Sequence, residues 1–165
     1  NNDVINEAVT MIDNSCKQVR AISHNLVPPS LKNFSLIEAV NNYCENMDSI
    51  HKPEISFQHI GEPIFLNKKV EVNIFRIIQE LVTNAIKHAQ ATTIDAQISN
   101  RNNMLLLTVE DNGKGYENKP EKQLGIGLDN MKSRVKYLNA TFEVVTNKSG
   151  TYNTIEIDLN TLNDN

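Results

Sequence analysis

The stretch Glu80-Leu81-Val82-Thr83-Asn84-Ala85-Ile86-Lys87-His88-Ala89 decides the fold, because apolar residues at helical spacing run beside polar ones. The apolar series begins upstream at Val70, and the whole pattern predicts one α-helix over residues 68–89 with a wide buried face. Asn67 is the expected N-cap of this helix, since its side-chain oxygen can accept from a backbone N–H of the first turn. We expect so apolar a helix to lie against the core of a domain.

Polar residues of the same helix are spaced so that they gather on one side. Glu80, Asn84 and His88 follow one another at four-residue intervals, which places them on one face, and Lys87 can reach the same region. A carboxylate, an amide, a cation and an imidazole are therefore expected beside the buried face. On its own, the pattern is more typical of an ordinary solvated helix face.

Two glycine-rich segments downstream carry the next signals. Asp111-Asn112-Gly113-Lys114-Gly115-Tyr116 follows a predicted strand and has the composition of a tight turn. Gly125-Ile126-Gly127-Leu128 opens another helix, and the backbone N–H groups of a helix start suit phosphate oxygens. The glycine spacing is not that of a P-loop, and either segment alone is weak evidence for a nucleotide site.

The order of the other elements predicts an α/β (α+β) two-layer sandwich with a mixed, largely antiparallel sheet and helices on one face. Ser35 and Glu38 form a capping-box pattern at the start of a helix over 35–50. The predicted strands cover residues 54–60, 92–99, 104–110, 141–146 and 151–159, and the last helix runs from about Leu128. We divide the chain into one long helix in residues 1–30 and a domain in residues 31–165.

The N-terminal helix, expected over residues 3–27 and ended by Pro28-Pro29, carries a narrow heptad stripe. Its members are Ile5, Val9, Ile12, Cys16, Val19, Ser23 and Leu26. The stripe predicts packing against another helix or chain, and the alternative is docking on the chain's own domain. Because the sequence starts at Asn1 without a methionine, we expect it to be a piece of a longer protein.

Composition narrows the classes of function. The chain has 165 residues, 39% of them hydrophobic, and a formal net charge of −4. This charge argues against a nucleic-acid surface but not against a nucleotide, which needs only a few local donors. No apolar run has the length of a bilayer span, so we expect no membrane contact by this chain. Cys16 and Cys44 fall at apolar helix positions without metal-site spacing, which favours buried thiols in a reducing compartment.

Taken together, the polar helix and the glycine segments resemble the ATPase domain of sensor histidine kinases, in the GHKL or Bergerat superfamily. Residues 80–89 look like the N box of that family, and residues 111–115 and 125–128 look like its two glycine boxes. Ser149-Gly150-Thr151 resembles the glycine-threonine pair before the last strand. The segments occur in the family order, and the resemblance covers nearly the whole chain.

One subgroup resembles the sequence best, the DesK/NarX-like kinases that partner NarL-type response regulators. The Lys87-His88-Ala89 ending and the short loop between the glycine boxes both fit this subgroup. The segment over 19–28 resembles the second helix of the subgroup's dimerisation hairpin, which would make residues 1–30 part of a truncated dimerisation and phosphotransfer hairpin.

The resemblance implies a role for each matching residue. Asp111 would accept a hydrogen bond from the adenine amino group, with support from Thr151. Asn84 would give a side-chain oxygen to Mg²⁺, and Glu80 would be the catalytic residue that orients a metal-bound water or assists proton transfer. The other implied ATP-binding residues are Lys87, His88, Gly113, Gly115, Tyr116, Gly125, Gly127 and Leu128, with residues 116–124 as the lid.

The implied enzyme is a protein histidine kinase that uses ATP and Mg²⁺ and passes the γ-phosphoryl group through a histidine to a NarL-type response regulator. His24 is not the expected acceptor, because Asn25 follows it and cannot take a proton; the acceptor is expected upstream of Asn1. We expect a homodimeric, cytoplasmic parent, of a kind that is often anchored in the inner membrane. The alternatives are an anti-sigma-type serine kinase of the same superfamily, a nucleotide-sensing interaction module, and a scaffold whose glycines only form turns.

Overall fold

The computed structural model describes residues 27–115 and 126–162, together with Ile5, Val9, Met11, Ile12 and Ser15. These five residues are helical, in the stretch where the sequence predicts a helix. The three that belong to the predicted heptad stripe, Ile5, Val9 and Ile12, are exposed, so this part of the stripe does not pack on the chain's own domain. The remainder of that predicted helix lies outside the described residues.

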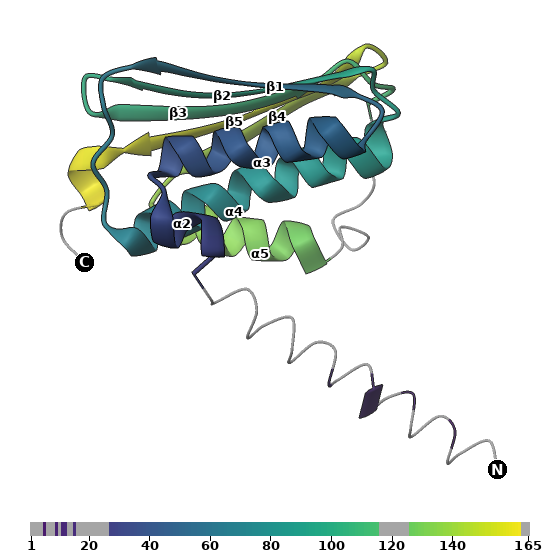
Figure 1. Ribbon diagram of the computed structural model, residues 1–165, viewed down its shortest axis with the longest axis horizontal. Coiled ribbons are helices and arrows are strands. Elements are labelled where there is room, and N and C mark those ends of the chain that lie inside the picture. The colour runs from purple at the N-terminus through teal and green to yellow at the C-terminus, as the bar shows by residue number, and fades with distance from the viewer. Residues whose placement is uncertain are drawn as a thin grey trace.

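Five strands form one sheet in the order β1-β2-β3-β5-β4 (Figure 1). Their bounds are Glu54–Gly61 (β1), Thr93–Arg101 (β2), Met104–Asp111 (β3), Thr141–Asn147 (β4) and Gly150–Asp158 (β5). β1 and β2 pair in parallel, and the other three pairings are antiparallel. The predicted mixed, largely antiparallel sheet is therefore confirmed.

The helices lie on one face of the sheet, which confirms the predicted two-layer sandwich (Figure 1). They are α2 (Pro29–Asn33), α3 (Leu36–Ile50), α4 (Lys68–Asn84) and α5 (Ile126–Tyr137), and a 3-10 turn, Leu159–Leu162, follows the last strand. Helix α2 was not predicted, because the two prolines were expected only to end the preceding helix. Pro29 instead begins α2, where a proline loses no helical hydrogen bond and its fixed φ suits the first turn.

Local sequence sets the starts of α3 and α4. The Ser35 hydroxyl accepts from Glu38 N at 3.3 Å, and the Glu38 carboxylate accepts from Ser35 N at 2.9 Å, so the predicted capping box is formed. Asn67 Oδ1 accepts from Val70 N at 2.9 Å, which confirms the predicted N-cap of α4. From these starts the apolar face of α4 packs onto the sheet through fully buried side chains, among them Ile74, Ile77, Ile78, Ile94, Ile98, Leu105, Leu107, Ile155 and Ile157.

The end of α4 departs from the prediction. The sequence predicts one α-helix to residue 89, whereas regular α-helix stops at Asn84 and Ala85–Ala89 forms a π-helical turn, η1. In a π turn each N–H bonds to the carbonyl five residues back instead of four. His88 therefore does not follow Asn84 at the regular α-helical spacing that the sequence predicted. Gln90, with a φ of 55°, then ends the helical segment in the left-handed region.

The structure also bears on the predicted buried thiols and on the predicted absence of a membrane span. Cys44 is a buried free thiol, and its burial raises the pKa of the thiol to about 12, which agrees with an inert core cysteine. Cys16 lies outside the described residues. Within the described part of the chain, no helix combines the length and apolar character needed to cross a membrane.

Candidate functional site

The predicted site segments meet where α4, β3, β5 and α5 come together. The register between β3 and β5 places Asp111 directly opposite Thr151. The loop after β3 lies against the end of the π turn, since Lys114 N donates to Ala89 O at 2.9 Å. Residues that are far apart in the sequence thus form one neighbourhood.

Asp111 is the buried acid of this neighbourhood, with a side chain only 5% exposed. Its Oδ1 accepts from Gly113 N at 2.9 Å, which fixes the orientation of the carboxylate. Thr151, 7% exposed, lies across the strand pair, and its hydroxyl is 3.3 Å from the Thr146 hydroxyl. A buried carboxylate with a hydroxyl beside it can recognise a neutral hydrogen-bond donor such as an amine.

Three glycines, in the loop after β3 and at the start of β5, lie at positions where a side chain would overlap backbone. A Cβ on Gly113 would overlap the backbone of Ala89, and one on Gly150 would overlap the Asp111 carbonyl. Gly115 has a φ of 62°, in the left-handed region, and a Cβ there would overlap the Asn147 carbonyl. The loop is therefore held between the π turn on one side and the β4–β5 turn on the other.

Asn112 has a structural role that the sequence analysis missed. Its Oδ1 accepts from Thr92 N at 2.8 Å and from Thr93 N at 3.0 Å. Its Nδ2 donates to the Thr92 hydroxyl at 2.8 Å. The side chain thus holds the loop after β3 to the start of β2, although the sequence suggested only a turn-forming residue.

Glu80 and Asn84 lie one helical turn apart on α4, and both are half-buried. The Glu80 carboxylate occupies the space that a side chain on Gly127 would fill, so the start of α5 lies directly against it. Lys87 and His88, on the π turn, are exposed. The structure therefore brings Glu80 and Gly127 together and leaves the two basic residues at the surface.

A polar stripe of α4 faces α5 and includes residues that the sequence analysis did not select. Arg134 of α5 donates to Asn73 Oδ1 at 2.9 Å. Burial and the nearby Arg76 guanidinium lower the pKa of Arg134, while the negative charge of Glu80 raises it. Asn73, Arg76 and Glu80 are spaced by three and four residues, so helical periodicity places all three on one face of α4 and could have identified them from the sequence.

Three predicted site residues are not fully covered by the described part of the chain. Tyr116 and Gly125 lie outside the described residues, as does the predicted lid. The backbone of Leu128 belongs to α5, and its side chain is not described. Among the described residues, no group of three His, Cys, Asp or Glu side chains could hold a metal ion. A magnesium ion held by one amide and by phosphate oxygens needs no such group.

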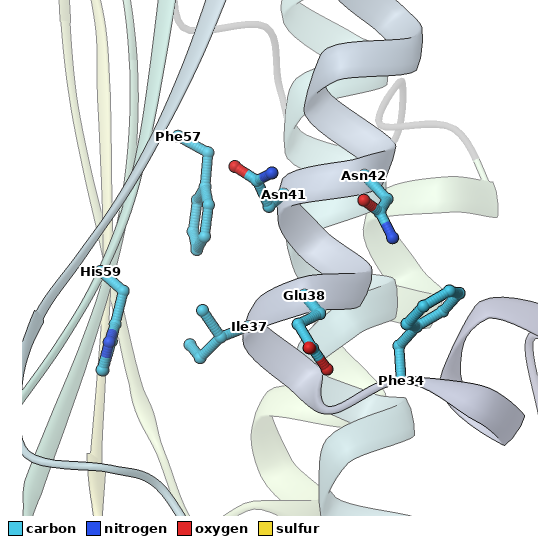
Figure 2. Close-up of a pocket in the computed structure, with 7 residues that line it drawn as sticks. All are labelled: Phe34, Ile37, Glu38, Asn41, Asn42, Phe57 and His59. Atoms are coloured by element: carbon cyan, nitrogen blue, oxygen red, sulfur yellow. The ribbon is translucent and has the colours of Figure 1, made fainter.

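A separate hollow of about 360 Å³ lies between α3 and β1 (Figure 2). Figure 2 shows Phe57 and His59 of β1 facing Ile37 and Asn41 of α3. None of the residues that line this hollow belongs to the predicted site, which is built from α4, α5 and the ends of β3 and β5.

A family model, the histidine kinase-, DNA gyrase B- and HSP90-like ATPase, matches residues 69–161. The match begins in α4 and runs through the Asp111 loop, the start of α5 and Thr151. The chain belongs to this ATPase family. Within it, the chain is an ATP-binding catalytic domain of the histidine kinase type.

Named relatives agree with this assignment. "Sensor protein VraS" of Staphylococcus saprophyticus is 32% identical over 136 residues, which is 82% of this chain and 39% of that protein. "Sensor protein VraS" of Staphylococcus aureus (strain COL) is 31% identical over 151 residues, 91% of this chain and 43% of that protein. The chain thus spans less than half the length of these curated relatives.

Solved structures show the same fold at low sequence identity. The histidine kinase domain of the blue-light activated histidine kinase of Erythrobacter litoralis EL346 aligns with a TM-score of 0.67 and 20% identity, over 77% of this chain and 62% of that one. The histidine kinase AdeS of Acinetobacter baumannii aligns with a TM-score of 0.61 and 21% identity, over 76% and 64% of the two chains. The ATPase-type fold predicted from the sequence is confirmed.

Proposed function

We propose that this domain binds Mg-ATP and supplies the γ-phosphoryl group to a histidine upstream of this chain, for relay to a NarL-type response regulator. The observation that carries the proposal is the buried Asp111 carboxylate, oriented by Gly113 N, in a loop whose glycines pack closely on the backbone of Ala89 and Asn147. Membership of the ATPase family supports the choice of ATP as the ligand.

The adenine ring would lie against the loop after β3. Gly113 N already occupies Oδ1 of Asp111, so the adenine amino group would donate to Oδ2. The Thr151 hydroxyl, opposite Asp111 in the strand register, would support this contact directly or through a water. Gly113 and Gly115 would hold the loop in this position, because a Cβ on either would overlap the backbone of Ala89 or Asn147.

The phosphates would lie between the end of α4 and the start of α5. Asn84 would hold Mg²⁺ through its amide oxygen, and bound magnesium would neutralise charge on the phosphates. Glu80 would orient the attacking group, with Arg134 as the positive charge beside it. Lys87 and His88 would contact phosphate oxygens from the surface, and Tyr116, Gly125, Gly127 and Leu128 would complete the site.

The phosphoacceptor and the partner follow from the resemblance to DesK/NarX-like kinases. His24 lies outside the described residues and is followed by Asn25, so the proposed acceptor is a histidine further upstream. The exposed apolar residues Ile5, Val9 and Ile12 support a helix that pairs with another helix, as a homodimeric parent requires. A parent of this kind would present its acceptor histidine to the ATP site across that helical hairpin.

The test is calorimetric titration of this chain with a non-hydrolysable ATP analogue, with and without Mg²⁺. We expect saturable one-site binding that Asp111→Asn weakens by about 10-fold to 100-fold, since a charged hydrogen bond contributes about 1.5–3 kcal/mol. Asn84→Ala should remove the Mg²⁺ dependence of the affinity. Asp95→Asn is the matched control, because Asp95 is exposed on β2 away from this site, and its affinity should be unchanged. Equal affinity of the Asp111→Asn variant and the control would contradict the proposed adenine contact.

A further inference from the structure

The sheet has a second face that no described element covers (Figure 1). We call it the open face. Strand alternation turns every second residue of each strand toward it, and the register aligns Ser56, Asp95, Glu110, Tyr152 and Val145 in one row across all five strands. The Ser56 hydroxyl donates to Asp95 Oδ1 at 2.5 Å, so the side chains of Ser56 and Asp95 share this face.

The open face is strongly acidic. Its exposed charged residues are Glu54, Asp95, Glu110, Glu143, Glu156 and a single cation, Arg101. Strand alternation also turns the half-buried Asp158 toward this face, so six acids lie there with one base. None of the five exposed carboxylates forms an ion pair with a described residue.

Two of these acids lie directly opposite each other. Asp95 of β2 pairs in the antiparallel register with Glu110 of β3. Like charges in such a position destabilise a sheet, and nothing described on this face offsets them except the Ser56 hydroxyl. A cation from outside the chain would remove the repulsion.

Large apolar side chains lie among the acids. Ile60, Met104, Val145 and Tyr152 are between 41% and 62% exposed, and each belongs to the open face by strand alternation. Val145 and Tyr152 are cross-strand neighbours. Exposed apolar and aromatic residues surrounded by charge are the composition of a protein interface.

We propose that the open face docks a basic, amphipathic segment of a partner protein. Lysine or arginine side chains would neutralise Asp95 and Glu110, and apolar side chains would cover Val145 and Tyr152. A second copy of this chain is a poor occupant, because two faces of the same charge repel, and nucleic acids and anionic membranes are repelled for the same reason. The face is separate from the proposed ATP site, so docking would leave the nucleotide pocket open.

The probe is a fluorescein-labelled amphipathic peptide made only of lysine and leucine, titrated with this chain and followed by anisotropy. We expect saturable binding that weakens as salt is raised. The double variant Asp95→Asn/Glu110→Gln should weaken binding about tenfold, and Val145→Thr/Tyr152→Ser should weaken it with the salt dependence kept. The matched control Glu62→Gln/Asp129→Asn removes the same charge from other exposed positions and should leave the affinity within about twofold.

Each outcome decides the proposal. If the control pair weakens the peptide as much as the Asp95/Glu110 pair, the attraction comes from net charge and the docking face is wrong. No effect of the Val145/Tyr152 pair would equally overturn it. Titration of the same variants with the ATP analogue should give unchanged affinity, so that failure of the docking face is separated from failure of the proposed ATP site.

Discussion

The two ends of helix α4 are formed in different ways. At its start, Asn67 Oδ1 accepts from Val70 N at 2.9 Å, and Lys68 forms an ion pair with Glu71 at 2.6 Å. At its end, the regular helix gives way to the π turn Ala85–Ala89, and the Ala89 carbonyl accepts from Lys114 N, a residue of the loop after β3. The start depends mainly on neighbours in sequence, and the end depends on a distant loop.

The difference explains where the proposed site lies. A helix end fixed by its own sequence would keep its shape whatever the rest of the chain did. The end of α4 is instead shaped by contact with Gly113 and Lys114, so the helix residues and the Asp111 loop are positioned together. A π turn at such a junction is common at functional sites. We therefore expect substitutions at the end of α4 to lower the free energy of unfolding more than substitutions at its start.

The largest effect is expected from Gly113→Ala. The new Cβ would overlap the backbone of Ala89, which cannot move aside as a side chain would. We expect a loss of about 2–3 kcal/mol in the free energy of unfolding, as for overpacked interiors, and a parallel loss of nucleotide affinity. Urea denaturation and calorimetric titration measure the two quantities.

The control for this change is Asn102→Gly in the β2–β3 turn. Asn102 and Asn103 have φ values of 53° and 60°, which suit a two-residue hairpin turn that glycine also accepts. We expect a change within about 0.5 kcal/mol. If Gly113→Ala changed the free energy of unfolding as little as this control, the end of α4 would not depend on the loop contact.

A smaller effect is expected from Asn112→Ala. The variant loses the two backbone hydrogen bonds that hold the loop to Thr92 and Thr93, and the free energy of unfolding should fall by about 1–2 kcal/mol. Hydrogen exchange should show faster opening at the start of β2. Asn112→Asp keeps the acceptor oxygen and should recover most of the stability, whereas equal loss in both variants would contradict the hydrogen-bond explanation.

What the sequence predicted well depends on local rules. The caps at Ser35 and Asn67 follow from residue types three positions before the N–H they bind, and both are formed. Apart from the end of α4 and the unpredicted α2, strand and helix bounds agree with the structure within about two residues, because hydrophobic periodicity reports which residues face the core. The adenine-binding role of Asp111 was instead implied by the family resemblance, and the structure shows that its side chain is buried.

What the sequence did not predict depends on contacts between distant residues. Nothing in Ala85–Ala89 itself signals a π turn, since regular α-helical spacing fits its apolar residues equally well. The role of Asn112 needs β2 beside the loop, and the position of Arg134 against Asn73 needs α5 packed on α4. Local patterns carry no information on these pairings. The site residues could be selected, but their arrangement could not.

A still smaller effect is expected at the start of α4. Asn67→Ala removes the side-chain acceptor for Val70 N and should lower the free energy of unfolding by about 1 kcal/mol, without changing nucleotide affinity. The control is Asn46→Ala, at an exposed position within α3, where alanine is the better helix former and no loss is expected. A nucleotide defect in the Asn67→Ala variant would show that the two ends of α4 are coupled.

The smallest effect is expected from the pH dependence of the α3 start, a second locally determined helix end. Hydrogen bonds from the Ser35 backbone and hydroxyl lower the pKa of Glu38 below its usual 4.5. A lowered folded-state pKa means that the ionised carboxylate stabilises the fold above the unfolded pKa, and that this contribution is lost as the pH falls through the folded pKa. Thermal unfolding should therefore show Glu38→Gln slightly less stable than the parent near neutral pH, with the difference closing below pH 4.5. A difference that persisted unchanged in acid would mean that Glu38 acts through packing, and that even this helix start is not set by its cap alone.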